Sequence, residues 1–178
     1  MSEKMLLAIR DCLLEHTLSK PEQKVLKDYM LDRLSLDSFS STRYCPGHFT
    51  ASAFVLSADA SKLLLIYHPK FQRWIQPGGH LEAEDSSIEA AARRELREET
   101  GLCDVFSKGS VHLAVHRVPA KKNKPAHEHW DIRFLFQVSS EVSFKGELSA
   151  AWFRIADIDE QKSDHSVLSF ISDCLSRN

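Results

Sequence analysis

No stretch of this sequence is apolar for long enough to cross a membrane. Every hydrophobic run falls short of the roughly 18–20 residues that a transmembrane helix needs. Near the N-terminus the apolar residues are interrupted by Arg10 and Asp11, which makes this segment a poor match to a secretory signal peptide. We therefore expect a protein of the cytoplasm that does not associate with membranes.

Basic residues are also not in excess. The chain has 23 Lys and Arg against 25 Asp and Glu, which gives a formal net charge of −2. A general nucleic-acid binder normally carries a basic surplus that neutralises phosphate groups. We therefore do not expect a nucleic acid to be the partner of this protein.

The sequence has only four cysteines, and no two of them are close together in the sequence. Cys12, Cys45, Cys103 and Cys174 lie far apart, which argues against a zinc-binding motif or a disulfide framework and predicts free thiols. The sequence contains no internal repeat and no low-complexity tract. Its 178 residues predict one domain with room for an appendage.

The first 45 residues are predicted to form that appendage, a pair of helices. Residues 3–16 give the first helix. The second begins where Ser19 can act as the cap and Pro21 lies in the first turn, and its apolar stripe continues at helical spacing to Leu34. We predict that this helical pair packs on the main domain or forms a homodimer contact.

Residues 46–178 are predicted to form the main domain, a mixed sheet with helices. The segments that resemble strands are 50–56, 62–67, 110–117, 130–138 and 149–155. One helix is predicted over 86–100, ending at Gly101, and an amphipathic helix over about 167–175 closes the chain. This mixture predicts an α+β fold, organised as an α/β/α sandwich.

Three carboxylates fall on one face of the helix predicted over 86–100. Glu95, Glu98 and Glu99 occupy positions i, i+3 and i+4, which span an arc of about 100°. Like charges at this spacing weaken a helix, and a divalent cation would remove the repulsion because hard cations prefer oxygen ligands. Arg94, four residues before Glu98, can orient one carboxylate. The alternative is a solvated, charged helix face.

The segment from Gly79 to Leu102 resembles the signature of the Nudix hydrolase family. That signature is Gly, five residues, Glu, seven residues, and then Arg-Glu-apolar-any-Glu-Glu-any-Gly-apolar. Residues 94–102, with the sequence RELREETGL, match the second half without exception. In the first half Asp85 replaces the Glu, and eight residues rather than seven separate it from Arg94. One extra loop residue would absorb this difference, and the role of Asp85 stays open. The resemblance extends to roughly residues 48–176.

The resemblance implies a hydrolase that cleaves a phosphoanhydride bond in a small, nucleotide-like diphosphate, a nucleoside diphosphate linked to another group. It implies Glu95, Glu98 and Glu99 as ligands of Mg²⁺, with Mn²⁺ as a substitute, and the Gly79 carbonyl as a further ligand. Glu98, Glu99 and Arg94 would form the catalytic group. A diphosphate repels hydroxide, so metal ions are needed to neutralise its oxygens and to lower the pKa of the attacking water.

A second polar cluster is predicted on the strand that begins near residue 127. His127, His129, Asp131 and Arg133 alternate with apolar residues and therefore share one face. One interpretation is a groove for substrate phosphates, contacted by Arg133, by His127 and His129, and by His80 from the glycine loop. The other is a face that simply meets water. A His-x-His pair on a strand also permits a transition-metal site.

Four further residues have two interpretations each. Glu147 or Glu128 supplies one more acidic metal ligand, or both lie on the surface. Phe71 and Trp74 stack on a base, or they pack in the core as most aromatic residues do.

Two other functions compete with hydrolysis. Isopentenyl diphosphate isomerase also resembles Nudix proteins, but that chemistry requires a cysteine in the active-site stretch after the tryptophan, and Trp74 is followed by Ile-Gln-Pro-Gly-Gly. A non-catalytic, nucleotide-binding regulatory module of the same fold usually loses acids from the helix, whereas this chain keeps all three. The sequence therefore favours an enzyme.

Overall fold

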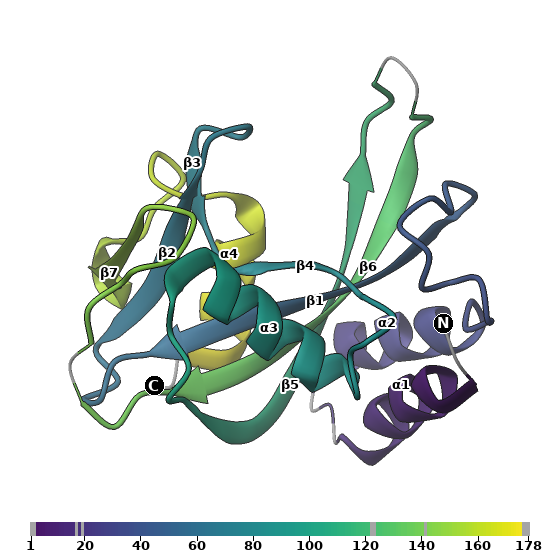
Figure 1. Cartoon of the computed structure of the whole chain (residues 1–178), viewed down its shortest axis with the longest axis horizontal. Helices are drawn as coiled ribbons and strands as arrows, with labels where there is room; N and C mark the ends of the chain where they lie inside the picture. Colours follow the sequence, from purple (N-terminus) through teal and green to yellow (C-terminus); the bar gives the residue numbers. More distant parts are fainter. Residues whose placement is uncertain (1–2, 17, 19, 122–123, 141, 176–178) are drawn as a thin grey trace. The chain divides into compact units, whose positions relative to one another are not determined.

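The computed structural model describes residues 3–16, 18, 20–121, 124–140 and 142–175 (Figure 1). These residues form two compact units. The first unit comprises Met1–Ala51, Gly79–Ala92 and Val111–Arg133, and the second comprises Ser52–Gly78, Arg93–Ser110 and Phe134–Asn178. Five elements have residues in both units. These elements are β1 (Gly47–Leu56), β4 (Gly78–His80), α3 (Ile88–Thr100), β5 (Phe106–Val118) and β6 (His127–Gln137).

The first unit contains the predicted helical pair, α1 (Glu3–Glu15) and α2 (Pro21–Leu31), which lie side by side (Figure 1). The predicted cap Ser19 lies outside the described residues, and Pro21 occupies the first turn as expected. Helix α2 ends three residues before the predicted Leu34. The Asp32 N–H still bonds four residues back, to the Asp28 carbonyl (3.0 Å). The two N–H groups after it bond only three residues back, as in a turn: Arg33 to Met30 and Leu34 to Leu31 (3.2 Å each).

Gln23 attaches α2 to β5. The Gln23 side chain donates to the Leu113 carbonyl (2.9 Å) and accepts from the Leu113 N–H (2.7 Å), so its amide replaces the backbone of a neighbouring strand. Gln23 is buried, and both backbone groups of Leu113 are satisfied by this one side chain. The helical pair therefore packs on the sheet, one of its two predicted roles, while a homodimer contact stays a prediction.

The strands form one seven-stranded sheet with the order β3-β2-β1-β6-β5. Strand β4 pairs with β1, and β7 pairs with β2. In the second unit β2 (Lys62–His68) is antiparallel to β1, to β3 (Arg73–Ile75) and to β7 (Ala150–Arg154), with Leu64 opposite Trp152. Strand β1 is buried along its whole length, as a central strand should be. The sheet and its helices confirm the predicted α+β sandwich class.

Two short strands and the form of the last helix were not predicted. Strands β3 and β4 (Gly78–His80) have three residues each, too few to show a period. Helix α4 (His165–Phe170) continues as a π-helical turn, η2 (Ile171–Leu175), rather than as one regular helix. The Asp164 carboxylate caps α4 by accepting the Val167 N–H (3.1 Å).

The core of the second unit lies between α4 and the strands β1, β2 and β6. Phe54 and Phe170 stack with their ring centroids 3.6 Å apart. Trp74 contacts Tyr67 and Phe153 at the edge of this core, which favours packing over base stacking for this residue. Phe71 is 56% exposed beside His68. No helix within the described part of the chain is long and apolar enough to span a membrane.

Candidate active site

Helix α3 carries the three predicted acids. The Ser87 hydroxyl accepts the Ala90 N–H (3.1 Å), which is the bond expected of an N-cap, so the helix begins two residues later than predicted. Buried Ile88 and Leu96 lie on its apolar stripe. The helix ends at Gly101, whose φ of +77° is a conformation that glycine adopts without strain.

The loop 145–148 covers the C-terminal end of α3. Its backbone N–H groups donate to carbonyls that a helix end leaves without intrahelical partners: Lys145 to Thr100 (3.0 Å), Glu147 to Glu98 (2.9 Å) and Leu148 to Glu99 (3.0 Å). Gly146 permits this approach, because a Cβ atom there would lie 2.2 Å from the Glu99 carbonyl carbon. The same loop therefore brings Glu147 to the acidic face of the helix.

Replacing Gly146 with alanine should loosen this loop. The added methyl group would clash with the α3 backbone, so either the loop or the end of the helix must shift. We expect this shift to lower the free energy of unfolding by about 1–3 kcal/mol. Urea denaturation would measure this cost. Lys145→Ala, which adds no atom at the contact, is the matched control. Equal stability of Gly146→Ala and the control would contradict the close approach.

The acidic cluster is held by one arginine and one backbone amide. Arg94 donates through Nη1 to Glu95 Oε1 (3.0 Å) and to Glu98 Oε2 (3.2 Å), so it orients two carboxylates rather than the one predicted. The Gly78 N–H donates to Glu99 Oε2 (3.0 Å). Burial, and then the negative charges of Glu95, Glu147 and Glu98, raise the pKa of Glu99 to about 7 in spite of that hydrogen bond.

These carboxylates fit a hard divalent cation. Four acids gather at one end of α3, and Arg94 offsets part of their charge. Burial and the neighbouring carboxylates both disfavour the charged form of Glu99, and a bound cation would offset both effects. Glu147 is thus the better placed of the two acids predicted from outside the helix. Gly79 belongs to the first unit, and its role as a ligand stays a prediction.

The raised pKa of Glu99 predicts a pH-dependent stability in the absence of divalent ions. Between the ordinary value of 4.5 and about 7, the folded chain holds a proton that the unfolded chain releases. The free energy of unfolding should therefore fall as the pH rises through this range, by on the order of 2 kcal/mol. Denaturation in chelator at pH 5 and pH 8 would measure the fall.

The control for this prediction is Glu99→Gln, which cannot titrate at this position and should give a flatter profile. Mg²⁺ should stabilise the natural chain more at pH 8 than at pH 5, since the ion competes with the proton for the carboxylate. The same slope in both proteins would assign the pH dependence to other groups.

Asp85, the residue that departs from the family signature, closes the loop before α3. Its carboxylate accepts the Glu82 N–H (2.7 Å), and its own N–H donates to the Glu82 carbonyl (3.3 Å). These two bonds hold the loop in a tight turn. The structure therefore gives Asp85 a role in loop conformation, a role that the sequence left open.

Arg133 and Asp131 form a buried ion pair in the first unit. Arg133 is 0% exposed and donates through Nε to Asp131 Oδ2 (2.9 Å). Burial alone would raise the pKa of Asp131, but the adjacent His116 imidazole (Nε2 to Oδ2, 3.6 Å) and the charge of Arg133 hold this pKa far below its ordinary value. The Thr50 hydroxyl also donates to this carboxylate (3.1 Å). Arg133 further contacts His116 Nε2 through Nη2 (2.8 Å).

The interpretation of this strand face as one that meets water is wrong at Asp131 and Arg133. Both side chains are buried, because each offsets the charge of the other, and Thr50 and His116 give them further polar contacts. The predicted contact between Arg133 and a substrate phosphate stays a prediction.

The other three predicted substrate contacts lie together. His80, His127 and His129 gather around His48, whose ring centroid lies 5.0, 5.3 and 4.7 Å from theirs, respectively. His48 was not predicted, although His48, Thr50 and Ser52 alternate with apolar residues along β1 and so mark a polar face. Burial and the neighbouring histidines lower the pKa of His129 to about 3, so this ring is neutral at pH 7.

Glu128, the second acid predicted from outside the helix, accepts two hydrogen bonds within the first unit. The Tyr29 hydroxyl donates to Glu128 Oε2 (2.6 Å), and the Trp130 indole N–H donates to the same oxygen (3.0 Å). These bonds connect α2 to β6. A contribution of Glu128 to the metal site stays a prediction.

Comparison with known sequences gives a consistent family. A model of the NUDIX domain matches residues 47–172. The chain is similar to a protein of Lactococcus lactis subsp. cremoris named a probable DHNTP pyrophosphohydrolase, with 31% identity over 62% of this chain and 64% of that one. It is also similar to phosphatase NudJ of Escherichia coli K12, with 40% identity over 38% of this chain and 39% of that one. The similarity therefore spans less than two thirds of either relative.

Solved structures share the fold. The dihydroneopterin triphosphate pyrophosphohydrolase of E. coli aligns with a TM-score of 0.56 and 12% identity, over 72% of this chain and 96% of that one. The NUDIX domain of Shewanella oneidensis NrtR, solved as a complex with ADP ribose, aligns with a TM-score of 0.52 and 18% identity, over 84% of this chain and 97% of that one.

The family model spans more than two thirds of the 178 residues, and the acidic helix α3 lies inside the match. The match begins at residue 47 and leaves the N-terminal helical pair outside, and the predicted domain boundary between residues 45 and 46 stays a prediction. With the sequence signature, the fold and the family model in agreement, this chain belongs to the NUDIX family.

Proposed function

We propose that this protein is a metal-dependent hydrolase that cleaves a phosphoanhydride bond in a nucleoside diphosphate linked to another group. The observation that carries the proposal is the cluster of Glu95, Glu98 and Glu99 on α3, with Glu147 beside it. Arg94 holds two of these carboxylates in a fixed orientation. A group of acids that repel one another, held in place at a helix end, is well suited to bind Mg²⁺ or Mn²⁺.

The residues of the cluster would have different roles in the reaction. A bound ion would neutralise the phosphate oxygens and lower the pKa of the attacking water. Glu95, Glu98 and Glu99 would hold that ion, and Glu98 and Glu99 would lie nearest to the chemistry, as the family signature implies. Arg94 and the Gly78 N–H would fix the carboxylates before substrate arrives, so that little reorganisation is needed in the transition state.

The names of the similar proteins suggest which substrates to test. The Lactococcus relative and one E. coli neighbour are named for hydrolysis of dihydroneopterin triphosphate, and the Shewanella domain was solved with ADP ribose. We therefore place a pteridine triphosphate and ADP-ribose beside nucleotide sugars, dinucleotide polyphosphates and oxidised nucleoside triphosphates in the test panel. Capped RNA ends complete it.

The test is incubation of the full chain with each compound in Mg²⁺, in Mn²⁺ and in chelator, with products identified by mass spectrometry. Metal-dependent release of a nucleoside monophosphate, or of pyrophosphate from a triphosphate, would support the proposal and identify the substrate class. Measurable nucleotide binding without turnover across the panel would overturn it in favour of a regulatory module.

A further inference from the structure

Two buried imidazole nitrogens of the first unit have no hydrogen-bond partner among the described residues. His48 is wholly buried, and its Nδ1 lies 2.9 Å from the Arg43 carbonyl, which can only accept a hydrogen bond. Nδ1 therefore carries the proton, and in the neutral ring Nε2 carries the lone pair. Nε2 of His48 and Nε2 of His129 are both buried without a partner. Leaving such a buried group without a hydrogen bond is destabilising, and a bound ligand would remove that cost.

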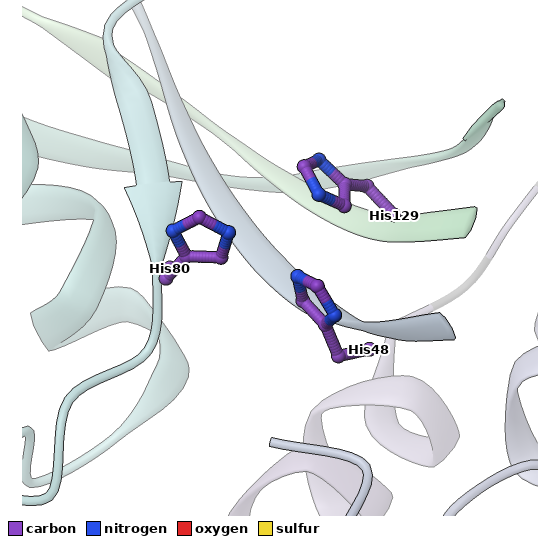
Figure 2. A group of neighbouring side chains, drawn as sticks. All are labelled: His48, His80 and His129. Atoms are coloured by element: carbon purple, nitrogen blue, oxygen red, sulfur yellow. The ribbon is translucent and has the colours of Figure 1, made fainter. Parts of the chain in front are cut away.

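These two histidines lie close to a third. His48 lies on β1, His129 on β6 and His80 on β4, and one ring nitrogen from each lies within 4.8 Å of the other two. Figure 2 shows the three rings turned toward one another from their separate strands. Ligand nitrogens around a tetrahedral zinc ion lie about 3.3 Å apart, so the rings need to close by at most about 1.5 Å.

We propose that His48, His80 and His129 form a binding site for one transition-metal ion of the zinc class. Imidazole nitrogen suits Zn²⁺, Co²⁺ and Ni²⁺, whereas Mg²⁺ and Ca²⁺ prefer oxygen ligands. The site is thus chemically distinct from the carboxylates of α3. The bond from His48 to the Arg43 carbonyl fixes the ring and its tautomer, as the second hydrogen bond of a metal-ligating histidine usually does.

Three protein ligands leave one tetrahedral position open. A zinc ion held in this way would take a water molecule or an anionic oxygen, such as a phosphate or carboxylate oxygen, as its fourth ligand. His80 and His129, which the sequence predicts as substrate contacts, would then act through the ion. Binding of the ion at this site requires no hydrolase activity of the protein.

The test is Zn²⁺ titration of the full chain after treatment with chelator, in excess Mg²⁺ so that the carboxylates are already engaged. Competition with a chromophoric chelator would give affinity and stoichiometry, and Co²⁺ would report the geometry through its visible spectrum. We expect one ion per chain. His129→Asn, His48→Gln and His80→Asn should each weaken binding at least about tenfold and abolish the tetrahedral cobalt spectrum.

Two control variants distinguish this site from Zn²⁺ binding at the carboxylates of α3 or at an exposed histidine. Glu99→Gln removes an acid of α3, and His165→Asn removes an exposed histidine of the second unit; both variants should bind Zn²⁺ like the natural chain. Unchanged binding in the three histidine variants, or loss of binding in Glu99→Gln, would overturn the proposal. If the buried His48→Gln fails to fold by circular dichroism, the exposed His80→Asn still decides the question.

Discussion

Glu99→Gln should lower turnover in Mg²⁺ by about 10²–10³-fold while the fold stays intact. Glutamine has the size of glutamate and can still accept the Gly78 N–H, so the helix end should keep its conformation. The substitution removes the negative charge that would hold the ion, and fixed electrostatic groups of this kind contribute about 10²–10³-fold each to catalysis. The measurement is kcat and kcat/KM on the best compound of the panel.

Glu98→Gln should behave in the same way, because both carboxylates lie on the same face of α3. Glu160→Gln, an exposed acid in a loop of the second unit, is the matched control and should keep normal turnover. Circular dichroism would confirm that all three variants fold. Near-normal activity of Glu99→Gln and Glu98→Gln would mean that the metal site lies elsewhere.

Arg133→Met should lower the free energy of unfolding by about 3–5 kcal/mol. The substitution removes the positive charge that pairs with the buried Asp131 carboxylate. A buried charge that has lost its partner is costly. Urea denaturation at pH 7 would measure the loss. Methionine retains much of the length of the side chain, so the effect would report charge more than an empty cavity.

The double variant Asp131→Asn, Arg133→Met separates the two interpretations of Arg133. If the pair is structural, the double variant should be more stable than Arg133→Met alone, because neither charge is then left without the other. If instead Arg133→Met kept its stability and raised only KM, Arg133 would be the phosphate contact that the sequence suggested.

The acidic helix could be predicted from the sequence because its determinants are local. The three acids share a face through the helical period, and Gly101 ends the helix within a few residues of them. The contribution of Gly146 could not be predicted, since its requirement for glycine comes from the α3 backbone more than 40 residues away in the sequence. A glycine in a polar loop has no distinguishing local pattern.

The histidine cluster and the buried ion pair could be predicted from the sequence only in part. Alternation along one strand predicts one shared face for His129, Asp131 and Arg133, but the burial of these side chains depends on partners from other strands. Thr50, which bonds to Asp131, lies 81 residues before it. His48 and His80 likewise reach His129 only through strand pairing, which no local period encodes.

The attachment of loop 145–148 to the end of α3 limits where residues can be inserted into this sequence or deleted from it. The three backbone hydrogen bonds of this loop fix the number of residues between Lys145 and Leu148. One inserted residue would therefore displace Glu147 and break hydrogen bonds to the carbonyls at the end of α3. Insertions and deletions should therefore be tolerated poorly here. A library of single-residue insertions should be depleted of variants at 145–148 and retain them at exposed loop positions such as 119–120.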